Sequence, residues 1–309
     1  MVLRDDYGRP LLNLRVAITR RCNLQCQYCH LEGEENVKKN SAQEMTVDEI
    51  VRIVRIAAEL GISNVKLTGG EPLMRKDIVE IVKGTAAVPG LTDLSMTTNG
   101  VMLAYLAEEL QANGLKRVNI SLPTLNAEMY NKLTGGRLED VLEGVKAAVN
   151  VKLDPVKLNM VILRDVNDDA VPEMIEFAKE TGTILQLIEL EPINIDRTYF
   201  ATHHKPLDDY EVMLKQRAVS VRTREYMQNR RIYHLPDATV EIVHPIENTD
   251  FCQKCTRLRI TSDGKLKPCL MRNDNLVDIL TPMRNGAQDQ ELIKLFKLAN
   301  MKRQPYNKN

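Results

Sequence analysis

The sequence carries no net charge, because 42 lysines and arginines balance 42 aspartates and glutamates over its 309 residues. This balance removes the global electrostatic argument for binding nucleic acid or an anionic membrane, so an anion would have to bind at a local site. The sequence also lacks any apolar run of about 18 residues that could span a bilayer. Its first residues, "MVLRDDYGRP", lack the apolar core of a signal peptide. We therefore expect a soluble, cytoplasmic protein that binds neither nucleic acid nor a membrane.

Cysteine is scarce, with six residues, and in a reducing compartment these are more often metal ligands or redox groups than structural disulfides. Three of them, Cys22, Cys26 and Cys29, lie in "CNLQCQYC", directly after a strand-like run. Structural zinc and the usual iron–sulfur clusters take four protein ligands, so three thiolates leave one metal position open for a small molecule. The alternative is a Cys3His zinc site completed by His30.

The other three cysteines form a second set with the spacing C-x2-C-x13-C, namely Cys252, Cys255 and Cys269. No cysteine remains to complete either set, so the sequence predicts a second metal centre that is also one thiolate short. Because C-x2-C is a common half-site for zinc, the alternative is a zinc knuckle closed by His244 or by a carboxylate.

The chain repeats a unit of a short strand followed by a helix. The first helix has a clear start, with Thr46 and Glu49 as a capping box, and an apolar stripe that runs to Gly61. Six such units in series predict an α/β fold with a parallel sheet, which either closes towards a barrel or is covered on both faces. The six expected strands are 14–19, 65–69, 94–99, 117–122, 156–163 and 184–191.

The repeat ends near residue 195, and we expect a second region, 196–309, of mixed α+β structure. Its turn signal is Asp263-Gly264, which predicts a hairpin. The expected elements are a helix at 207–217, strands at 231–235 and 239–245, the hairpin at 257–270 and a helix at 289–302.

Polar residues recur at alternate positions of the expected strands, and alternate positions of a strand share one face. Strands covered by helices on both faces would be apolar throughout. The pattern therefore predicts a wide or incomplete barrel with a polar, basic interior, and the alternative is that these residues are solvated strand ends. They are Arg15, Thr19, Lys66, Thr68, Ser95, Thr97, Asn99, Asn119, Ser121, Lys157 and Asn159.

Two further features favour a charged ligand in such an interior. Arg257 and Arg259 are two residues apart in "CTRLR", so they share a strand face and form a guanidinium pair suited to a polyphosphate. The "GGEP" segment after the second strand has glycines that allow a close backbone approach and Glu71, which could bind the ammonium group of an amino acid. The alternative for "GGEP" is an ordinary strand-to-helix turn.

The first cysteine motif, with Tyr28 directly before its third cysteine, resembles that of the radical S-adenosylmethionine (radical SAM) enzymes. With the second set included, the chain is similar over nearly its whole length to the GTP 3′,8-cyclase family of molybdenum cofactor biosynthesis. The similarity is carried by "YGRPLLNLRVAITRRCNLQCQYC", "KLTGGEPLMRKDI", "MTTNG", "VNISL" and "FCQKCTRLRITSDGKLKPCL". It implies an incomplete (β/α)6 TIM-type barrel over 1–195, and a C-terminal α+β extension, 196–309, that carries a second iron–sulfur cluster and closes the barrel.

The resemblance also implies roles for single residues. The ligands of two [4Fe-4S] clusters are Cys22, Cys26, Cys29, Cys252, Cys255 and Cys269. The residues that bind S-adenosylmethionine are Tyr28, Gly69, Gly70, Glu71, Ser121 and Glu191. The residues that bind GTP are Arg15, Lys66, Thr97, Lys157, Arg257 and Arg259. The catalytic residues are Cys22, Cys26, Cys29, Arg257 and Arg259.

The reaction that the resemblance implies is a lyase reaction in which S-adenosylmethionine is cleaved reductively at the first cluster. The resulting 5′-deoxyadenosyl radical takes the C3′ hydrogen of GTP, and the sugar radical attacks C8 of a guanine held at the second cluster. The implied partners are a flavodoxin- or ferredoxin-like electron donor and the downstream cyclic pyranopterin monophosphate synthase. A homodimer is implied by the resemblance alone.

The chain departs from the family at three places. It has "SLPT" at 121–124 where many members have "SLDA", and Glu191 where some have methionine. It ends in "RQPYNKN", without the double glycine that many members place in the active site. Two other readings stay open: a radical SAM enzyme that modifies a peptide or another small molecule, and a zinc-binding interaction protein.

Overall fold

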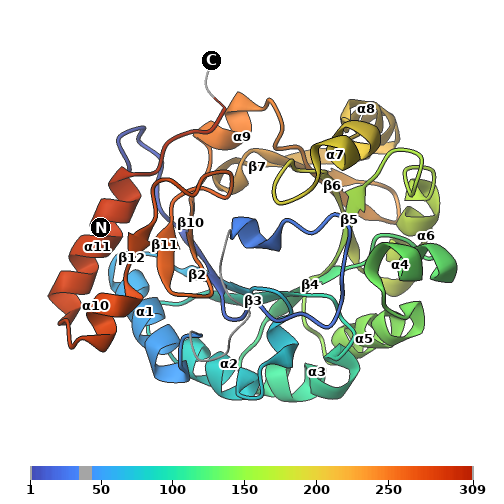
Figure 1. The fold of residues 1–309 in the computed structure, drawn as a ribbon. Helices are drawn as coiled ribbons and strands as arrows, with labels where there is room; N and C mark the ends of the chain where they lie inside the picture. Colours follow the sequence, from blue (N-terminus) through green and yellow to red (C-terminus); the bar gives the residue numbers. More distant parts are fainter. Residues whose placement is uncertain (1, 35–43, 308–309) are drawn as a thin grey trace.

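The strands of the protein form one twelve-stranded sheet, in a computed structural model that describes residues 2–34 and 44–307. The strand order is β12-β11-β10-β1-β2-β3-β4-β5-β6-β9-β8-β7 (Figure 1). Strands β1 to β6 are neighbours in sequence order and run parallel. They confirm the six predicted strands, with ends that differ by one or two residues. Their bounds are β1 Asn13–Ala17, β2 Asn64–Thr68, β3 Asp93–Thr98, β4 Arg117–Ser121, β5 Val156–Ile162 and β6 Ile184–Glu189.

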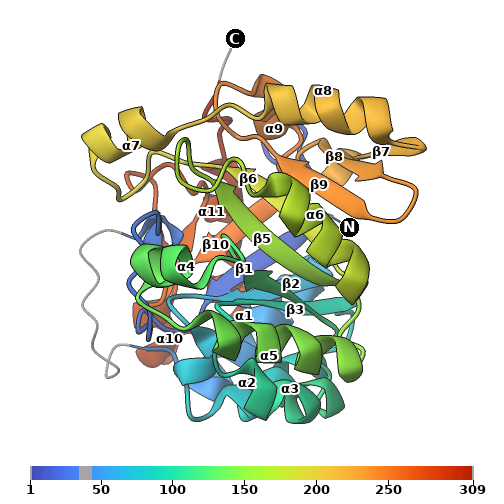
Figure 2. The same cartoon turned by 90° about the vertical axis from the view of Figure 1, so that its right-hand side faces the viewer.

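The helices between these strands cover the outer face of the curved sheet (Figures 1 and 2). The first of them has the predicted capping box, in which Thr46 Oγ1 accepts from the Glu49 N–H at 3.2 Å. Its apolar stripe, including Ile50 and Ile53, is buried against the sheet. The helices are α1 Val47–Glu59, α2 Ile78–Ala86, α3 Leu103–Ala112, α4 Ala127–Thr134, α5 Leu138–Asn150 and α6 Val171–Thr181.

The C-terminal part of the chain extends both edges of the same sheet. Strand β9 pairs in parallel with β6, and β10 pairs in parallel with β1. Antiparallel partners then follow on each side, β8 and β7 beyond β9, and β11 and β12 beyond β10. The strands are β7 Ser220–Arg224, β8 Arg230–His234, β9 Thr239–Val243, β10 Arg257–Ile260, β11 Lys265–Lys267 and β12 Val277–Asp278.

The expected C-terminal elements are confirmed, including the hairpin of β10 and β11. Strand β7 was not expected, because its sequence "SVRTR" is exposed almost throughout and has no apolar face. The helices of this part are α7 Arg197–His203, α8 Asp208–Arg217, α9 Thr249–Gln253, α10 Leu280–Arg284 and α11 Asp289–Met301. Figure 2 shows α7 and α8 on the opposite side of the molecule from α2, α3 and α5.

The two faces of the parallel strands differ as the alternation predicts. Apolar residues such as Val16, Leu67 and Ile120 are fully buried on the outer face, under the helices. Most of the intervening polar residues line a cavity on the other face of the sheet, and Figure 1 shows the space that the curved sheet surrounds. The sheet therefore keeps its apolar core outside and its polar face inside.

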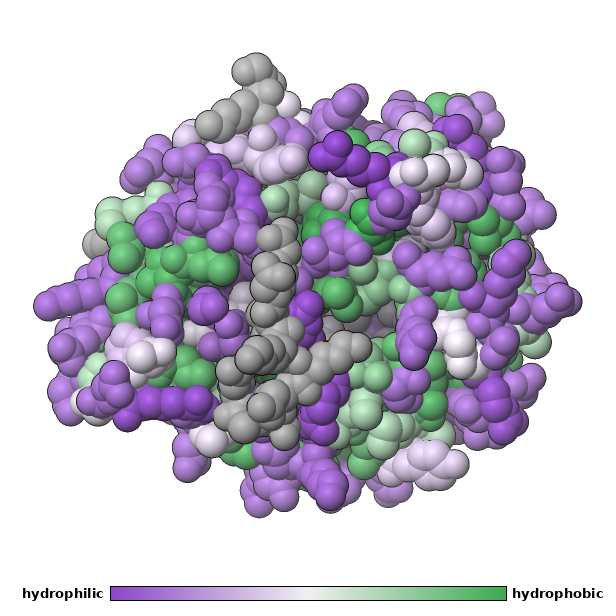
Figure 3. Space-filling model, in the orientation of Figure 1, coloured by the Kyte–Doolittle hydropathy of each residue, from purple (hydrophilic) through white to green (hydrophobic). Residues whose placement is uncertain are grey.

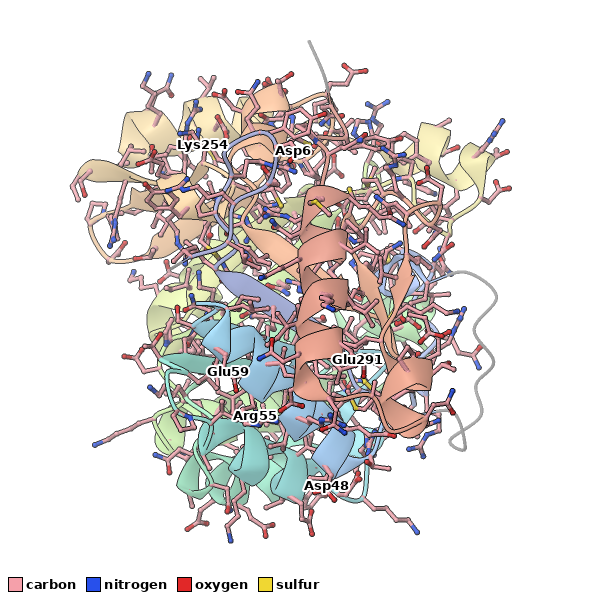
Figure 4. The ribbon with its side chains drawn as sticks, turned by 90° about the vertical axis from the view of Figure 1, so that its left-hand side faces the viewer. Asp6, Asp48, Arg55, Glu59, Lys254 and Glu291 are labelled. Carbon is pink, nitrogen blue, oxygen red and sulfur yellow. The ribbon has the colours of Figure 1, made fainter. Side chains whose placement is uncertain are left out.

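Helix α11 packs against α1, so the C-terminal part of the chain lies beside its first helix. Asp289 at its start accepts from Arg55 Nη2 at 2.6 Å and from Arg52 Nε at 2.8 Å, and Figure 4 shows Arg55 on α1 beside α11. Most of the surface in Figure 3 is hydrophilic. Among the described residues, no helix has the length and apolar character needed to cross a bilayer.

Candidate active site

One cavity, on the inner face of the sheet, brings together residues from both halves of the chain. It contains almost all of the residues that the sequence singled out for a site. The predicted residues that line it are Arg15, Cys22, Cys26, Tyr28, Cys29, Lys66, Gly69, Gly70, Thr97, Ser121, Lys157, Glu191, Cys252, Cys255, Arg257, Arg259 and Cys269. Glu71 is the predicted site residue that does not belong to this lining.

The polar alternation predicted this lining well. Nine of the eleven polar strand residues line the cavity: Arg15, Lys66, Thr68, Thr97, Asn99, Asn119, Ser121, Lys157 and Asn159. Thr19 differs because it lies beyond the end of β1, where its hydroxyl bonds Glu44. Ser95 differs because its short side chain donates to the Val65 carbonyl of the neighbouring strand at 3.3 Å.

The first cysteine loop follows β1 at the carboxyl end of the parallel strands, where parallel barrels place their active sites. The N–H of Gln25 donates to Thr134 O at 2.8 Å, which fixes the loop to the end of α4. Cys22 Sγ accepts from the Leu24 N–H at 3.4 Å. Burial, together with the neighbouring Cys29 and Cys22 sulfurs, raises the pKa of Cys26 to about 12. Three thiolates this close together would repel one another, so all three can ionise only if a cation is bound between them.

The "GGEP" turn is pressed against the cysteine loop. The Gly70 N–H donates to Thr19 O at 2.8 Å, and the Glu71 N–H donates to Arg21 O at 2.7 Å. A Cβ on Gly70 would lie 2.2 Å from Arg21 O, and Gly69 has φ 144°. The glycines therefore allow the end of β2 to touch the backbone of the cysteine loop, in addition to lining the cavity.

Glu71 lies behind the cavity wall and is completely buried. Its carboxylate accepts from the backbone N–H of Asn99 at 2.6 Å, from Thr98 Oγ1 at 2.7 Å and from the Leu73 N–H at 3.0 Å. Burial raises the pKa of Glu71 to about 7, against these three hydrogen bonds. Asn99 in turn lines the cavity and donates through Nδ2 to Cys22 Sγ at 3.9 Å. Glu71 thus holds the end of β3 beside the cysteine loop.

The strand register places basic side chains side by side across the sheet. Arg15 on β1 is level with Arg259 on β10 and with Lys66 on β2. Asn119 on β4 is level with Lys157 on β5 and accepts from Lys66 Nζ at 2.6 Å. Side chains at matching positions on neighbouring strands lie close together, so the register itself creates a basic surface.

Four further cations reach this cavity that the sequence did not single out: Arg9, Arg117, Arg224 and Arg230. The alternation of polar residues did not reveal these arginines, because they lie at strand ends or outside the repeated strand–helix units. With Arg15, Lys66, Lys157, Arg257 and Arg259, the described lining has nine arginine and lysine side chains. Its carboxylates are those of Glu32, Glu189 and Glu191. The cavity therefore favours a ligand with several negative charges.

The charges of these cations are only partly compensated. Lys157 pairs with Glu241, a buried residue of β9 that also lies 3.0 Å from Arg224 Nη1. For Lys66 and Arg257, by contrast, the described part of the chain offers no carboxylate within ion-pair distance. Burial holds the pKa of both well below its ordinary value, and the nearby arginines act in the same direction. A half-buried cation without an anionic partner is costly, and a bound anion would offset that cost.

The second cysteine set also lines the cavity. Cys252 lies on α9, Cys255 lies between α9 and β10, and Cys269 follows β11. Arg303, beyond the end of α11, is buried and donates through Nη2 to Cys255 O at 2.5 Å. Burial acts against ionisation of the Cys255 thiol, yet the Arg303 guanidinium helps to hold its pKa below the ordinary value. The Asn307 N–H donates to Cys252 Sγ at 3.5 Å. The described tail thus reaches the second cysteine set.

The histidines that could complete a zinc site make other contacts. His30 Nδ1 accepts from the Glu32 N–H at 3.0 Å, and His244 Nε2 lies 3.5 Å from Glu189 Oε2. In the described residues, no three or more His, Cys, Asp and Glu side chains converge as the ligands of one ion do.

Two carboxylates of the cavity escaped the sequence analysis. Glu32 lies between Arg15 and Arg259, and Glu189 Oε1 lies 2.8 Å from His204 Nε2. Neither glutamate lies in a motif, and only the fold brings their partners near. His204 also lies in no motif, and the structure places it against a buried carboxylate of the cavity.

Two family models match successive parts of the chain. Residues 16–178 match the family described as the radical SAM superfamily, and residues 183–309 match the family described as Molybdenum Cofactor Synthesis C. The chain is 50% identical to a Thermococcus kodakarensis protein named probable GTP 3′,8-cyclase, over 99% of both chains. It is 42% identical to a Methanocaldococcus jannaschii protein of the same name, again over 99% of both.

Solved structures with a similar fold are more distant in sequence. Streptococcus suis SuiB bound to S-adenosylmethionine matches with a TM-score of 0.65 and 20% identity, over 85% of this chain and 61% of SuiB. Native anSMEcpe with bound AdoMet matches with a TM-score of 0.62 and 17% identity, over 94% of this chain and 82% of that one. At this identity the likeness concerns the fold. From its sequence relatives and its two family matches, the chain belongs to the radical SAM superfamily and, within it, to the GTP 3′,8-cyclase family.

Proposed function

We propose that this protein is a GTP 3′,8-cyclase, a lyase that converts GTP to (8S)-3′,8-cyclo-7,8-dihydroguanosine 5′-triphosphate in the first step of molybdenum cofactor biosynthesis. The observation that carries the proposal is the content of one cavity. It holds both cysteine trios and, among its nine cations, the half-buried Lys66 and Arg257, for which no carboxylate partner is described. The full-length relatives that bear this name support the same conclusion.

The first cysteine trio is proposed to hold a [4Fe-4S] cluster whose open iron binds S-adenosylmethionine. When bound, the cluster and S-adenosylmethionine supply the radical chemistry that a protein side chain cannot. Tyr28, Gly69, Gly70 and Ser121 line the cavity and are proposed to position S-adenosylmethionine. Glu191 also lines the cavity, at the position where some family members have methionine, and is proposed to contact S-adenosylmethionine.

In this proposal Glu71 does not bind S-adenosylmethionine directly. Because its carboxylate is buried and bonded to Asn99, Thr98 and Leu73, we propose that it is a positioning residue. It holds the Asn99 backbone, and through it the side chain that contacts Cys22. Orientation by such a support limits how far the cysteine loop can move.

GTP is proposed to lie across the basic part of the cavity. Arg257 and Arg259, with Arg15 and Lys66, would bind the triphosphate, since guanidinium groups bind phosphate oxygens in pairs. Thr97 and Lys157 are proposed to contact the nucleoside part. The second cysteine trio is proposed to hold a [4Fe-4S] cluster that orients the guanine base.

The finer architecture belongs to the same proposal. The curved sheet is read as an incomplete (β/α)6 barrel over residues 1–195, and residues 196–309 as the extension that carries the second cluster. A flavodoxin- or ferredoxin-like donor, the downstream cyclic pyranopterin monophosphate synthase and a second copy of the chain are the proposed partners.

The test is an anaerobic reaction of the reconstituted protein with S-adenosylmethionine, a reductant and GTP. We expect 5′-deoxyadenosine to form in a GTP-dependent manner, with equal amounts of a cyclised nucleotide detected by mass spectrometry. The Cys22→Ala variant should form neither product, and Arg257→Ala should lose the dependence on GTP. An equal yield of 5′-deoxyadenosine with and without GTP in the unmodified protein would contradict the proposal.

A further inference from the structure

Glu32 occupies the middle of the basic surface proposed for the triphosphate. Its Oε2 lies 2.6 Å from Arg259 Nη1, and its Oε1 lies 3.6 Å from Arg15 Nη1. The side chain is 11% exposed and lines the cavity. Both arginines were assigned to GTP on grounds that did not involve Glu32. The carboxylate therefore lies where a phosphate group would have to bind.

The charge of Glu32 is stable in this position. Although burial acts in the opposite direction, Arg15 and Arg259 lower the pKa of Glu32 to about 2. The carboxylate is thus an anion at every physiological pH and resembles a phosphate group in charge and in its oxygen acceptors.

The backbone that presents Glu32 is strained. Leu31 and Glu32 have φ values of 49° and 52°, in the left-handed region that residues with side chains seldom adopt, and Gly33 follows with φ 68°. Such positions are energetically costly and persist only where surrounding contacts hold them. In Figure 1 this turn is the short blue helix inside the ring of the sheet.

The same turn touches the second cysteine loop. A Cβ on Gly33 would lie 2.4 Å from Leu270 O, so the turn packs directly beside Cys269. Glu32 is the third residue after Cys29 in the chain. The turn thus lies between the two cysteine sets, and the ion pairs of Glu32 with Arg15 and Arg259 hold it in its strained form.

We propose that Glu32 is an internal substitute for a phosphate group, which neutralises Arg15 and Arg259 in the unliganded protein and must leave them when a triphosphate binds. This inference rests on the proposed function, because it takes the ligand to be a nucleoside triphosphate. Glu32 therefore opposes the binding of a triphosphate, whereas Arg15 and Arg259 favour it. Binding then exchanges one set of ion pairs for another, and it releases the strained turn.

The test compares Glu32→Gln with the unmodified protein, both with reconstituted clusters, by calorimetric binding at constant ionic strength. The probes are GTP, inorganic triphosphate and guanosine. Glu32→Gln should bind GTP and inorganic triphosphate about tenfold more tightly, which corresponds to the loss of one hydrogen bond between charged groups that the ligand must otherwise break. Guanosine, which lacks phosphates, should bind as before.

Glu241→Gln is the matched control. Glu241 also pairs with cations of this cavity, namely Lys157, Arg224 at 3.0 Å and Arg230 at 3.7 Å, but it is not part of the lining. Loss of its charge should not tighten the binding of inorganic triphosphate, because no phosphate group has to displace it. Equal gains in both variants would show a general effect of charge and would overturn the proposal, as would unchanged or weaker triphosphate binding in Glu32→Gln.

The outcome is distinct from the test of the proposed function. If the protein does not cyclise GTP, inorganic triphosphate still reports on competition between Glu32 and a phosphate chain. If it cyclises GTP and Glu32→Gln binds inorganic triphosphate no better, the function stands and the role of Glu32 is wrong. A second variant, Glu32→Asp, shortens the side chain while keeping its charge, and it should give a smaller gain than Glu32→Gln.

Discussion

At the scale of single residues, the carboxylate of Glu71 makes stability depend on pH. Burial raises its pKa to about 7, whereas the unfolded chain keeps the ordinary value near 4.5. The folded protein therefore binds the proton more tightly than the unfolded one. The stabilisation is complete below pH 4.5 and is lost as the pH rises through about 7, by about 3 kcal/mol at most.

The variant Glu71→Gln tests this, since glutamine stays uncharged throughout. Its free energy of unfolding should fall less than that of the unmodified protein between pH 4.5 and pH 7.5. Urea denaturation at several pH values gives the free energy of unfolding of each protein, and from it the slope against pH. Subtracting one slope from the other cancels the contributions of other titrating groups and the constant cost of an altered hydrogen bond. Parallel slopes would mean that Glu71 stays ionised in the folded protein.

At the scale of elements, the contact between the "GGEP" turn and the cysteine loop requires a residue without a Cβ. In Gly70→Ala the new Cβ would meet Arg21 O at 2.2 Å and Arg20 O at 2.7 Å, both of them backbone atoms that cannot rotate away. We expect the loop that carries Cys22 to shift and the first cluster to be lost preferentially. Iron and sulfide analysis after reconstitution should show about half the metal of the unmodified protein, since one of the two proposed clusters is affected.

Gly182→Ala is the control for this change. Gly182 has φ 65° with open space around it, so alanine there costs about 1 kcal/mol of backbone strain and touches neither cysteine set. Its iron content should equal that of the unmodified protein. If both glycine variants lose iron alike, the cause is general destabilisation and the contact has no special role.

The elements also show why part of the structure could be predicted from the sequence. The strands β1 to β6 and their polar inner face follow from a period of two and from helix signals, which are local. The pairing of β10 with β1 and of β9 with β6 joins residues far apart in the chain, and no local pattern encodes it. Glu32 and Glu189 were missed for the same reason, because their partners lie on other elements.

At the scale of the whole molecule, the sheet makes the two predicted regions depend on each other. Four residues of β1, from Asn13 to Val16, are in register with β10, and five residues of β6, from Ile184 to Ile188, are in register with β9. Without residues 196–309, both edges of the parallel sheet would expose unpaired N–H and C=O groups. The cavity would also lose Arg257, Arg259 and the second cysteine set.

We therefore expect the fragment 1–195 not to fold as a stable monomer, although it contains strands β1 to β6 and all the helices between them. Purified under the same anaerobic conditions, it should aggregate or show no cooperative thermal transition by circular dichroism, whereas the complete chain should unfold in one transition. The edge strands, rather than the missing cluster, are the expected cause, because the full-length variant with Cys252, Cys255 and Cys269 changed to alanine keeps both pairings and should fold. A fragment that is monomeric and unfolds cooperatively would show that residues 1–195 are an autonomous domain, and that β9 and β10 only dock onto a sheet already complete.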